Sequence, residues 1–286
     1  MDLIRDPAQW QERCSEARAS GRRMVLVPTM GYLHAGHLAL LREARRRAGG
    51  GVPPGLSLAT IFVNPTQFGP GEDLARYPRD LAGDLAKCAE AGVDMVLAPD
   101  PPGRMYGPGH ETWVEVERTS QGLCGARRPG HFRGVATVVT KLFNLSRPHV
   151  AIFGEKDWQQ LQVIRAMVRD LDFGIEIVGV PTVREPDGLA LSSRNAYLSP
   201  DERRGAVVLS RALQDARERA RGGERDAAQL VARAARAVEA AGARLDYLEI
   251  VDAGSLRRAD LVVPGCRMLV AAFFGTTRLI DNVGLP

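Results

Sequence analysis

Residues 24–38 read MVLVPTMGYLHAGHL and join an apolar run to a glycine-punctuated turn and the start of a helical pattern. Met24 to Val27 has the length and composition of a buried strand, and His37 to Arg47 has helical periodicity. Gly31 and Gly36 let the backbone between them approach a ligand closely. This order predicts the first strand, turn and helix of an α/β domain.

The same alternation continues over the first two thirds of the chain. Further strands are predicted at Leu56 to Val63, Met95 to Ala98, Val150 to Phe153 and Glu176 to Val180. Helices are predicted at Leu81 to Ala91, Val135 to Leu145 and Trp158 to Leu171. Strands that alternate with helices form a parallel sheet with crossover connections. The predicted fold class is therefore α/β, with a Rossmann-like doubly wound parallel sheet.

The pattern changes near residue 182. Two alanine- and arginine-rich helices are predicted at Asp201 to Arg221 and Glu224 to Ala241, and Gly222-Gly223 ends the first of them. Strand-like runs follow at Leu245 to Val251, Arg267 to Phe274 and Thr277 to Asp281. A chain of 286 residues has room for two domains. We predict a Rossmann-like domain at 1–182 and a smaller α+β C-terminal domain at 183–286.

Composition indicates an ordinary globular protein, with 45% apolar and 25% charged residues. The net charge of +4 is small and the charges are interspersed, so no nucleic-acid partner is expected. Four cysteines without a CxxC pair indicate reduced thiols rather than a zinc site or disulfide framework. The first residues lack the pattern of an export signal, and no apolar run has the length of a membrane span. We expect a cytoplasmic protein without a membrane partner.

The two histidines of the opening segment favour an anion as ligand. His34 and His37 lie where a helix begins, and a helix N-terminus presents free N–H groups and a positive dipole to phosphate. Imidazoles there can stabilise the charge that develops during phosphoryl or nucleotidyl transfer. Structural histidines and half of a metal site are the other interpretations. The position after the first strand, with two glycines, favours a nucleotide.

A second anion site is indicated at residues 154–160, GEKDWQQ, which again follow a strand. Lys156 is one of only three lysines, and its ammonium is suited to neutralising phosphate. Asp157 suits a helix N-cap, which is sufficient to explain it. Residues 187–195, DGLALSSRN, bring two hydroxyls and an arginine together in what we expect to be a mobile loop that closes over nucleotide.

Two further segments are weaker indications. Gln67, in the turn after the second strand, can donate to and accept from the oxygens of a small substrate. Asn64-Pro65 is explained as turn chemistry. The basic run RRPGHFRG at residues 127–134 suits an anion site or a solvated loop. No GxSxG elbow and no Walker motif is present, so a substrate carboxylate attacking phosphorus would need only positioning and charge stabilisation.

These motifs together resemble a known family. The HxGH pattern and the Ser-Ser-Arg loop are similar to the HIGH and KMSKS pair of the nucleotidyltransferase superfamily, which includes class I aminoacyl-tRNA synthetases. Within that superfamily the chain resembles the pantothenate synthetases, or pantoate–beta-alanine ligases, from about Arg22 to Asn282. The segments that carry the resemblance are 28–37, 62–68, 77–79, 128–132, 154–160 and 187–195.

The resemblance implies that pantoate attacks the α-phosphate of ATP to give pantoyl adenylate, from which β-alanine displaces AMP. It implies four catalytic residues, with His37 as the acid-type group: His34, His37, Lys156 and Arg194. It implies an ATP site made of Met30, Gly31, Tyr32, Leu33, His34, Ala35, Gly36, His37, Gly154, Glu155, Lys156, Asp157, Val183, Leu191, Ser192, Ser193 and Arg194. Gln67, Gln160 and His131 would bind substrate. Mg²⁺ on the phosphates, a C-terminal lid and a homodimer are also implied.

The sequence departs from the family pattern at two positions, and two other functions are possible. Thr66 stands where methionine is commoner, and Trp158 where tyrosine or phenylalanine is usual, which affects the predicted pocket but removes no catalytic group. A cytidylyl- or adenylyltransferase acting on a phosphorylated acceptor would share the histidine motif and give a product that retains AMP. An RNA-binding module is disfavoured by 6% aromatic residues and the lack of a long basic run.

Overall fold

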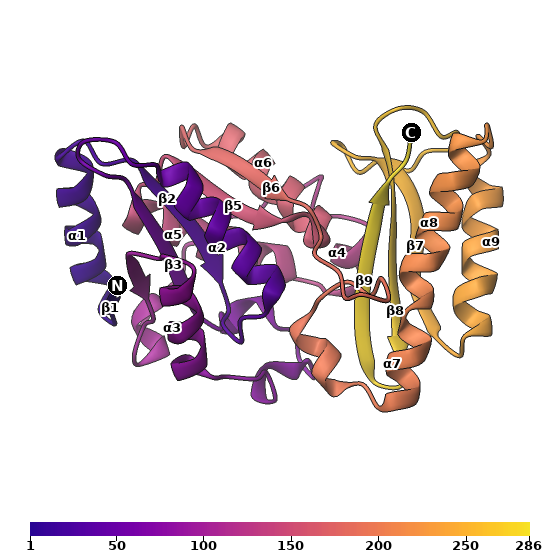
Figure 1. Ribbon diagram of the computed structural model, residues 1–286, viewed down its shortest axis with the longest axis horizontal. Coiled ribbons are helices and arrows are strands. Elements are labelled where there is room, and N and C mark those ends of the chain that lie inside the picture. Colours follow the sequence, from indigo (N-terminus) through magenta and orange to yellow (C-terminus); the bar gives the residue numbers. More distant parts are fainter. The chain divides into compact units, whose positions relative to one another are not determined.

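The computed structural model describes residues 1–286 and contains two compact units (Figure 1). The first comprises Met1–Ser120, Arg128–Glu155 and Val163–Pro181, and the second comprises Gln121–Arg127, Lys156–Gln162 and Thr182–Pro286. Two short segments, Gln121–Arg127 and Lys156–Gln162, therefore belong to the second unit although the chain on either side of each belongs to the first. The predicted division into domains at 1–182 and 183–286 stays a prediction.

The first unit is built on a six-stranded sheet in which every paired strand is parallel, in the order β1-β4-β3-β2-β5-β6. The strands are β1 (Asp2–Ile4), β2 (Met24–Thr29), β3 (Leu56–Ile61), β4 (Met95–Leu97), β5 (Val150–Gly154) and β6 (Glu176–Val180). This confirms the predicted doubly wound α/β class. β3 ends two residues before the predicted Val63, and β1 was not predicted because three residues give no periodicity.

Helices cover both faces of this sheet (Figure 1). They are α1 (Pro7–Ala19), α2 (Ala35–Ala48), α3 (Leu81–Glu90), α5 (His131–Ser146) and α6 (Trp158–Asp170). α2 and α3 share a core with Val25 and Val27 of β2, whereas α1 packs on α5. The fully buried Trp10 of α1 donates its indole N–H to Ser146 Oγ at 2.9 Å. The sequence did not indicate α1 because few of its residues face the core.

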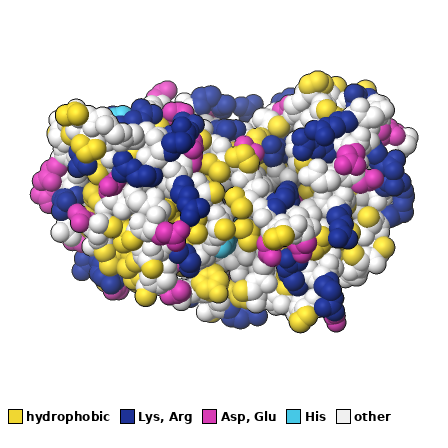
Figure 2. All heavy atoms as spheres, viewed as in Figure 1, with side chains coloured by type: hydrophobic (Ala, Val, Ile, Leu, Met, Phe, Trp, Pro, Cys, Tyr) yellow, Lys and Arg dark blue, Asp and Glu magenta, His cyan; other side chains and the backbone are white.

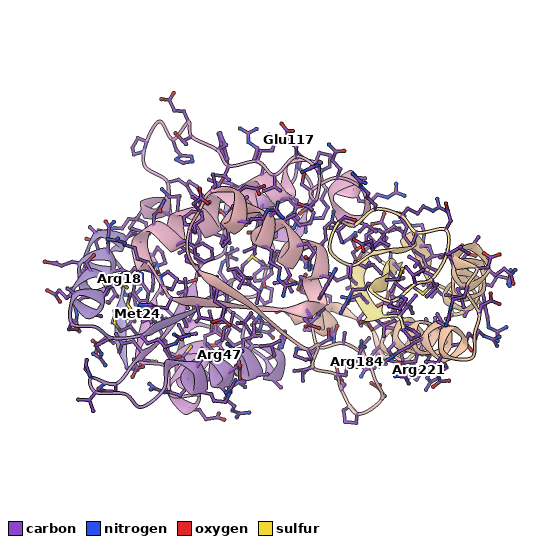
Figure 3. The ribbon with its side chains drawn as sticks, turned by 90° about the horizontal axis from the view of Figure 1, so that it is seen from above. Arg18, Met24, Arg47, Glu117, Arg184 and Arg221 are labelled. Carbon is purple, nitrogen blue, oxygen red and sulfur yellow. The ribbon has the colours of Figure 1, made fainter.

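Polar contacts fix the ends of these elements (Figure 3). The N–H of Met24 donates to Nδ1 of His149 at 3.0 Å, at the start of β2. Arg18 of α1 donates to the carbonyl of Arg147 at 2.7 Å, and Arg47 of α2 pairs with Glu176 of β6 at 2.9 Å. The strands β2 and β6 are therefore anchored at their amino ends, away from the loops that follow them.

The strand order reverses between β2 and β5, which are direct neighbours. From β2 the chain adds β3 and then β4 on one side, whereas β5 and β6 lie on the other. In open α/β sheets the crevice at such a switch point binds ligands, at the carboxyl ends of the strands. The segments after Thr29 and Gly154 leave the sheet at this point, and both are predicted nucleotide segments.

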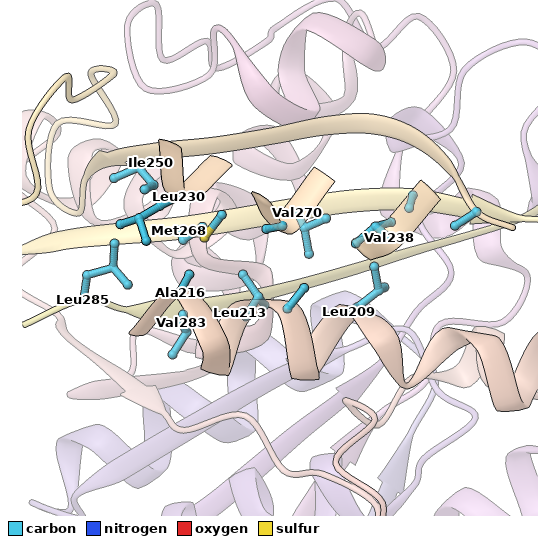
Figure 4. Packing of buried hydrophobic residues seen from close by; sticks show 14 of the residues in the cluster. Leu209, Leu213, Ala216, Leu230, Val238, Ile250, Met268, Val270, Val283 and Leu285 are labelled. Atoms are coloured by element: carbon cyan, nitrogen blue, oxygen red, sulfur yellow. The ribbon is translucent and has the colours of Figure 1, made fainter. Parts of the chain in front are cut away.

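The second unit packs helices on a three-stranded antiparallel sheet in the order β7-β8-β9. Its elements are α4 (Leu123–Arg127), α7 (Pro200–Ala206), α8 (Val208–Arg221), α9 (Ala227–Ala240), β7 (Arg244–Asp252), β8 (Cys266–Phe274) and β9 (Thr277–Gly284). Figure 4 shows Met268 and Val270 of β8 packed with Leu213, Leu230 and Val238 of the helices. The predicted α+β character is confirmed.

One predicted helix is interrupted. Asp201 to Arg221 was expected to be continuous, but α7 and α8 are separated at Val207, whose N–H bonds to the carbonyl of Gly205. Gly205 lies against a neighbouring turn, since a Cβ there would be 3.3 Å from the carbonyl oxygen of Ala241. The predicted stop at Gly222 is confirmed, because that residue caps α8.

The surface and the thiols agree with the composition. On the face shown in Figure 2, Lys and Arg side chains alternate with Asp and Glu and form no continuous basic stripe. All four cysteines are free and buried. None of the helices is long and apolar enough to cross a bilayer.

A buried carboxylate holds the turn between β2 and α2. Asp84 of α3 is 1% exposed and accepts the N–H of Tyr32 at 2.7 Å and that of Leu33 at 2.6 Å. Gly31 has φ +83°, and a Cβ there would lie 2.8 Å from Asp84 Oδ2. Burial raises the pKa of the Asp84 carboxyl, and the two N–H donors oppose that shift. The glycine therefore makes room for a carboxylate that binds two consecutive backbone N–H groups of this turn.

We predict that Asp84→Ala lowers the free energy of unfolding by about 2–4 kcal/mol, because two buried N–H groups lose their acceptor. Asp84→Asn should cost about half as much, since one amide oxygen still accepts and no charge is buried. Urea titration followed by circular dichroism measures both. Equal stability of wild type and Asp84→Ala would show that the turn is held by other contacts.

Candidate active site

The two histidines of the opening segment form the N-terminal cap of α2. Nδ1 of His34, the N-cap residue, accepts the N–H of Gly36 at 3.1 Å. Nδ1 of His37 accepts the N–H of His34 at 3.3 Å, which completes a reciprocal capping box. The ring centroids are 4.1 Å apart. The pair is therefore structural and fixed in orientation by the backbone it caps.

This cap also determines which nitrogen carries the proton. A backbone N–H can only donate, so each Nδ1 that accepts one must be unprotonated, and the neutral ring then holds its proton on Nε2. Nε2–H is a donor that suits a phosphate oxygen at a helix N-terminus. The structural interpretation and the catalytic interpretation of His34 and His37 are therefore compatible, because they use different ring nitrogens.

Gln67 lies beside this turn in the first unit. Its Nε2 donates to Met30 Sδ at 3.1 Å, and its Oε1 accepts from Asn64 Nδ2 at 3.1 Å. Asn64 Oδ1 in turn accepts from Thr66 Oγ1 and Tyr106 Oη, each at 2.9 Å. Burial raises the pKa of the Tyr106 hydroxyl, which stays protonated and donates. The structure thus brings the predicted residues Met30 and Gln67 together.

Asn64 has more than a turn-forming role. Its side chain also donates to the carbonyl of Gly134 in α5 at 3.2 Å. At Gly134 a Cβ would meet the carbonyl oxygen of Thr66 at 2.4 Å and the N of Gln67 at 2.7 Å. Only glycine permits this approach of α5 to the turn. Sequence reasoning missed Asn64 because the Asn-Pro pair was sufficiently explained by the turn.

His131, at the start of α5, supports Gln67 through the backbone. Its Nδ1 is 2.9 Å from the carbonyl oxygen of Gln67, and its Nε2 is 3.1 Å from Arg128 Nη1. Because a guanidinium only donates, Nε2 accepts and Nδ1–H donates to the carbonyl. Both ring nitrogens have protein partners, so the predicted contact of His131 with substrate stays a prediction.

A half-buried ion pair completes this part of the first unit. Arg128 binds both carboxylate oxygens of Glu72, at 2.8 and 2.5 Å. Burial works to raise the pKa of Glu72, but the hydrogen bonds and charge of Arg128 outweigh it, and the net shift is downward. The charge of Arg128 is therefore neutralised by Glu72. Within the basic run at 127–134, this arginine is not available as an anion-binding group.

In the second unit the predicted residue Lys156 lies in a short 3-10 turn before α6. Its carbonyl oxygen accepts from Asn282 Nδ2 of β9 at 2.8 Å. Trp158 donates its indole N–H to the carbonyl of Ala253 at 2.8 Å, and the guanidinium of Arg267 lies 3.5 Å from its ring centroid. The tryptophan that departs from the family pattern is thus a packing residue between the turn and the sheet. Gln160 is half-buried in the first turn of α6.

Residues 183–191 form a tight hairpin rather than an open loop, and Ser193–Tyr197 follow it as a 3-10 helix. Leu191 donates its N–H to the carbonyl of Val183 at 3.0 Å, and Ser192 Oγ accepts the N–H of Arg194 at 3.2 Å. Arg203 of α7 pairs with Glu185 at 2.6 Å and with Asp187 at 2.7 Å. Ser192, Ser193 and Arg194 therefore follow a hairpin that is held in place by Arg203. The predicted closure of this segment over nucleotide stays a prediction.

The predicted residues divide between the units. Met30–His37, Gln67, His131, Gly154 and Glu155 belong to the first, and Lys156, Asp157, Gln160, Val183 and Leu191–Arg194 belong to the second. No group of three or more His, Cys, Asp or Glu side chains is arranged to hold a metal ion. Asp84 and Asn282 are contacts that the sequence pattern did not indicate, because each acts on a segment distant in sequence.

Comparison with known proteins agrees with this geometry. The family described as pantoate-beta-alanine ligase matches residues 2–284. The pantothenate synthetase of Anaeromyxobacter dehalogenans is 70% identical over 100% of this chain and 99% of its own length. That of Myxococcus xanthus is 62% identical over 99% of this chain and 96% of its own.

Solved structures give the same result. A pantothenate synthetase from Thermus thermophilus superposes with a TM-score of 0.91 and 49% identity, covering 100% of both chains. A pantoate-beta-alanine ligase from Francisella tularensis, complexed with beta-gamma ATP and beta-alanine, has a TM-score of 0.80 and 30% identity over 99% of this chain and 97% of its own. The match spans both units and every motif described above, and the chain belongs to the pantoate-beta-alanine ligase family.

Proposed function

We propose that this chain joins (R)-pantoate to β-alanine through a pantoyl adenylate, with ATP converted to AMP and diphosphate. Family membership over residues 2–284 supports the overall reaction. The observation that carries the adenylate route is the histidine-capped start of α2, next to Gln67 and without any covalent nucleophile. This arrangement suits positioning and charge stabilisation, which suffice for phosphorus chemistry.

The first step balances without a protein nucleophile. A pantoate carboxylate oxygen attacks the α-phosphorus, the bond from that phosphorus to the bridging oxygen breaks, and diphosphate leaves. In the second step the neutral amine of β-alanine attacks the acyl carbon, AMP leaves with the mixed-anhydride oxygen, and the amine nitrogen loses a proton. Negative charge grows on phosphate oxygens in the first step, where N–H donors are most effective.

We assign roles to the predicted residues within this scheme. Nε2–H of His34 and of His37 donates to phosphate oxygens, and Lys156 and Arg194 neutralise charge on the same nucleotide. The remaining ATP contacts come from Met30–Leu33, Ala35, Gly36, Gly154, Glu155, Asp157, Val183 and Leu191–Ser193. Gln67 and Gln160 hold pantoate, with Gln67 also next to β-alanine. His131 serves by fixing the backbone of Gln67, in keeping with its two hydrogen bonds.

Magnesium enters this proposal as part of the substrate. Mg²⁺ is commonly bound through substrate phosphates with few protein ligands. We propose that the ion arrives on ATP as Mg·ATP and is not a resident cofactor of the protein. We also propose that the protein is a homodimer, as the family resemblance implies, and sedimentation of the purified protein tests this. We propose a cytoplasmic location as well.

The reaction itself is tested by incubating the chain with Mg·ATP and pantoate, with and without β-alanine. We expect diphosphate to require pantoate, and pantothenate with AMP to appear only when β-alanine is added; mass spectrometry of the product identifies each. A protein that binds ATP but releases no diphosphate with pantoate would contradict the proposal and direct attention to other acids and phosphorylated acceptors.

The catalytic role of the histidines can be separated from their capping role. Glutamine is a good N3 residue of a capping box and asparagine a good N-cap, so His37→Gln and His34→Asn should preserve the start of α2. We predict that His37→Gln lowers the single-turnover rate of adenylation by about 10²–10³-fold while ATP affinity changes far less. An unchanged melting temperature is the control, and near-normal adenylation would remove His37 from the mechanism.

The close approach at Gly134 gives a prediction about pantoate. Gly134→Ala introduces a methyl group that the carbonyl of Thr66 and the amide of Gln67 cannot accommodate, so the turn must move. We predict that KM for pantoate rises by about tenfold or more, whereas ATP affinity is retained. Steady-state kinetics with each substrate varied in turn measures this. The matched control is Gly103→Ala, because a Cβ at Gly103 has no neighbour within 4 Å. Gly130 is unsuitable as a control, because its φ of +80° would strain any other residue. An equal rise in KM for both substrates would argue against a local effect.

A further inference from the structure

We propose that Asp281 and Asn282, near the end of β9, are positioning residues that set the Lys156 turn and the Ser192–Arg194 segment for ATP. The inference rests on the proposed function, because it assigns both segments to nucleotide. Neither residue was singled out by the sequence as part of the site. Both are nearly fully buried, at 3% and 4% exposure, although their side chains are polar. Buried polar groups of this kind need partners, and those partners are informative.

Asn282 holds the backbone of the lysine turn. Its Nδ2 donates to the carbonyl oxygen of Lys156 at 2.8 Å, and its Oδ1 accepts from Nη1 of Arg267. A guanidinium only donates and a carbonyl only accepts, so the amide orientation is determined and an amide is the group required. The guanidinium of Arg267 also stacks on Trp158, two residues after the lysine. The turn is therefore fixed at both ends from the sheet.

Asp281 holds the base of the hairpin. Its carboxylate binds Arg184 through two hydrogen bonds, of 2.6 and 2.8 Å, and also accepts the N–H of Asn282 at 2.7 Å. Arg184 Nη1 donates in turn to the carbonyl of Gly188 at 3.0 Å, inside the hairpin that leads to Ser192. A bidentate guanidinium–carboxylate pair fixes orientation as well as distance. The hairpin is thereby tied to β9.

The strand explains how two adjacent residues reach two segments. Successive side chains of a strand point to opposite faces of the sheet. Leu279 and Val283 belong to the core formed with α8 and α9, so Asp281 shares that face, and Asn282 shares the other face with Arg267. One dipeptide thus connects the turn of Lys156 on one face with the hairpin of residues 183–191, which leads to Ser192, on the other. Sites supported by such buried hydrogen bonds hold their geometry best.

The decisive variant is Asn282→Asp. The carboxylate keeps the size of the amide and can still accept from Arg267, but it can no longer donate to the Lys156 carbonyl. We expect the single-turnover rate of adenylation to fall by about tenfold or more, with the aminolysis of supplied pantoyl adenylate reduced much less. Arg244→Ala is the matched control, because Arg244 stacks on Phe273 of the same sheet at 4.1 Å and touches neither segment. That variant should keep the wild-type rate.

A double-mutant cycle distinguishes positioning from general destabilisation. If Asn282 acts through Lys156, Asn282→Asp should have little further effect on the adenylation rate once Lys156→Ala is present. Multiplicative effects of the two changes, or a wild-type rate in Asn282→Asp, would overturn the inference. Asp281→Asn and Arg194→Ala form a second double-mutant cycle for the hairpin. Asp281→Asn should have little further effect on the adenylation rate once Arg194→Ala is present. If that variant fails to fold, the Asn282 cycle still decides the claim for the lysine turn.

The test remains decisive if the proposed reaction is wrong. In that case the wild-type protein would release no diphosphate with pantoate. The affinity of each variant for Mg·ATP, measured by calorimetry, is then compared in place of the adenylation rate. A weaker affinity in Asn282→Asp but not in Arg244→Ala would support the positioning role alone. Equal affinities in wild type, Asn282→Asp and Lys156→Ala would contradict it.

Discussion

The start of α2 is the constraint on which the site depends. The first N–H groups of a helix have no partners within the helix, and each must be satisfied from outside. Here the two histidines satisfy those of His34 and Gly36, and Asp84 satisfies those of Tyr32 and Leu33 in the preceding turn. The same hydrogen bonds that hold the turn leave both imidazoles with a proton on Nε2. Fold and chemistry are therefore specified by one set of backbone donors.

The rest of the first unit is arranged around this turn. Gln67 reaches Met30 because Asn64 orients the amide and because Gly134 lets α5 approach the turn. The second unit uses the same principle with different groups, since Asp281 and Asn282 satisfy Arg184 and the Lys156 carbonyl. In both units a buried polar side chain fixes a segment predicted to bind nucleotide or acid. Partly satisfied networks of this type are costly, so each partner should be sensitive to substitution.

The sequence predicted what depends on local pattern. Strand and helix periodicity indicated β2 to β6 and every long helix except α1, and the motifs located the loops at the carboxyl ends of β2 and β5. What it could not provide are contacts between distant residues: Asp84 lies about fifty positions from the turn it holds, and Asn282 lies 126 positions from Lys156. The grouping of 121–127 and 156–162 with the second unit is of the same kind. The break at Val207 was missed because it depends on the packing of Gly205.

The protonation of His34 and His37 determines whether their Nε2–H groups can donate to phosphate. Because the chain has only five histidines, ¹⁵N-labelled protein permits each ring to be assigned, with His34→Asn and His37→Gln identifying the pair. Long-range ¹H–¹⁵N correlation at neutral pH should show His34 and His37 as Nε2–H tautomers, with Nδ1 shifts typical of an acceptor nitrogen. Nδ1–H tautomers on both rings would contradict the cap, and with it the assignment of Nε2–H as the donor to phosphate.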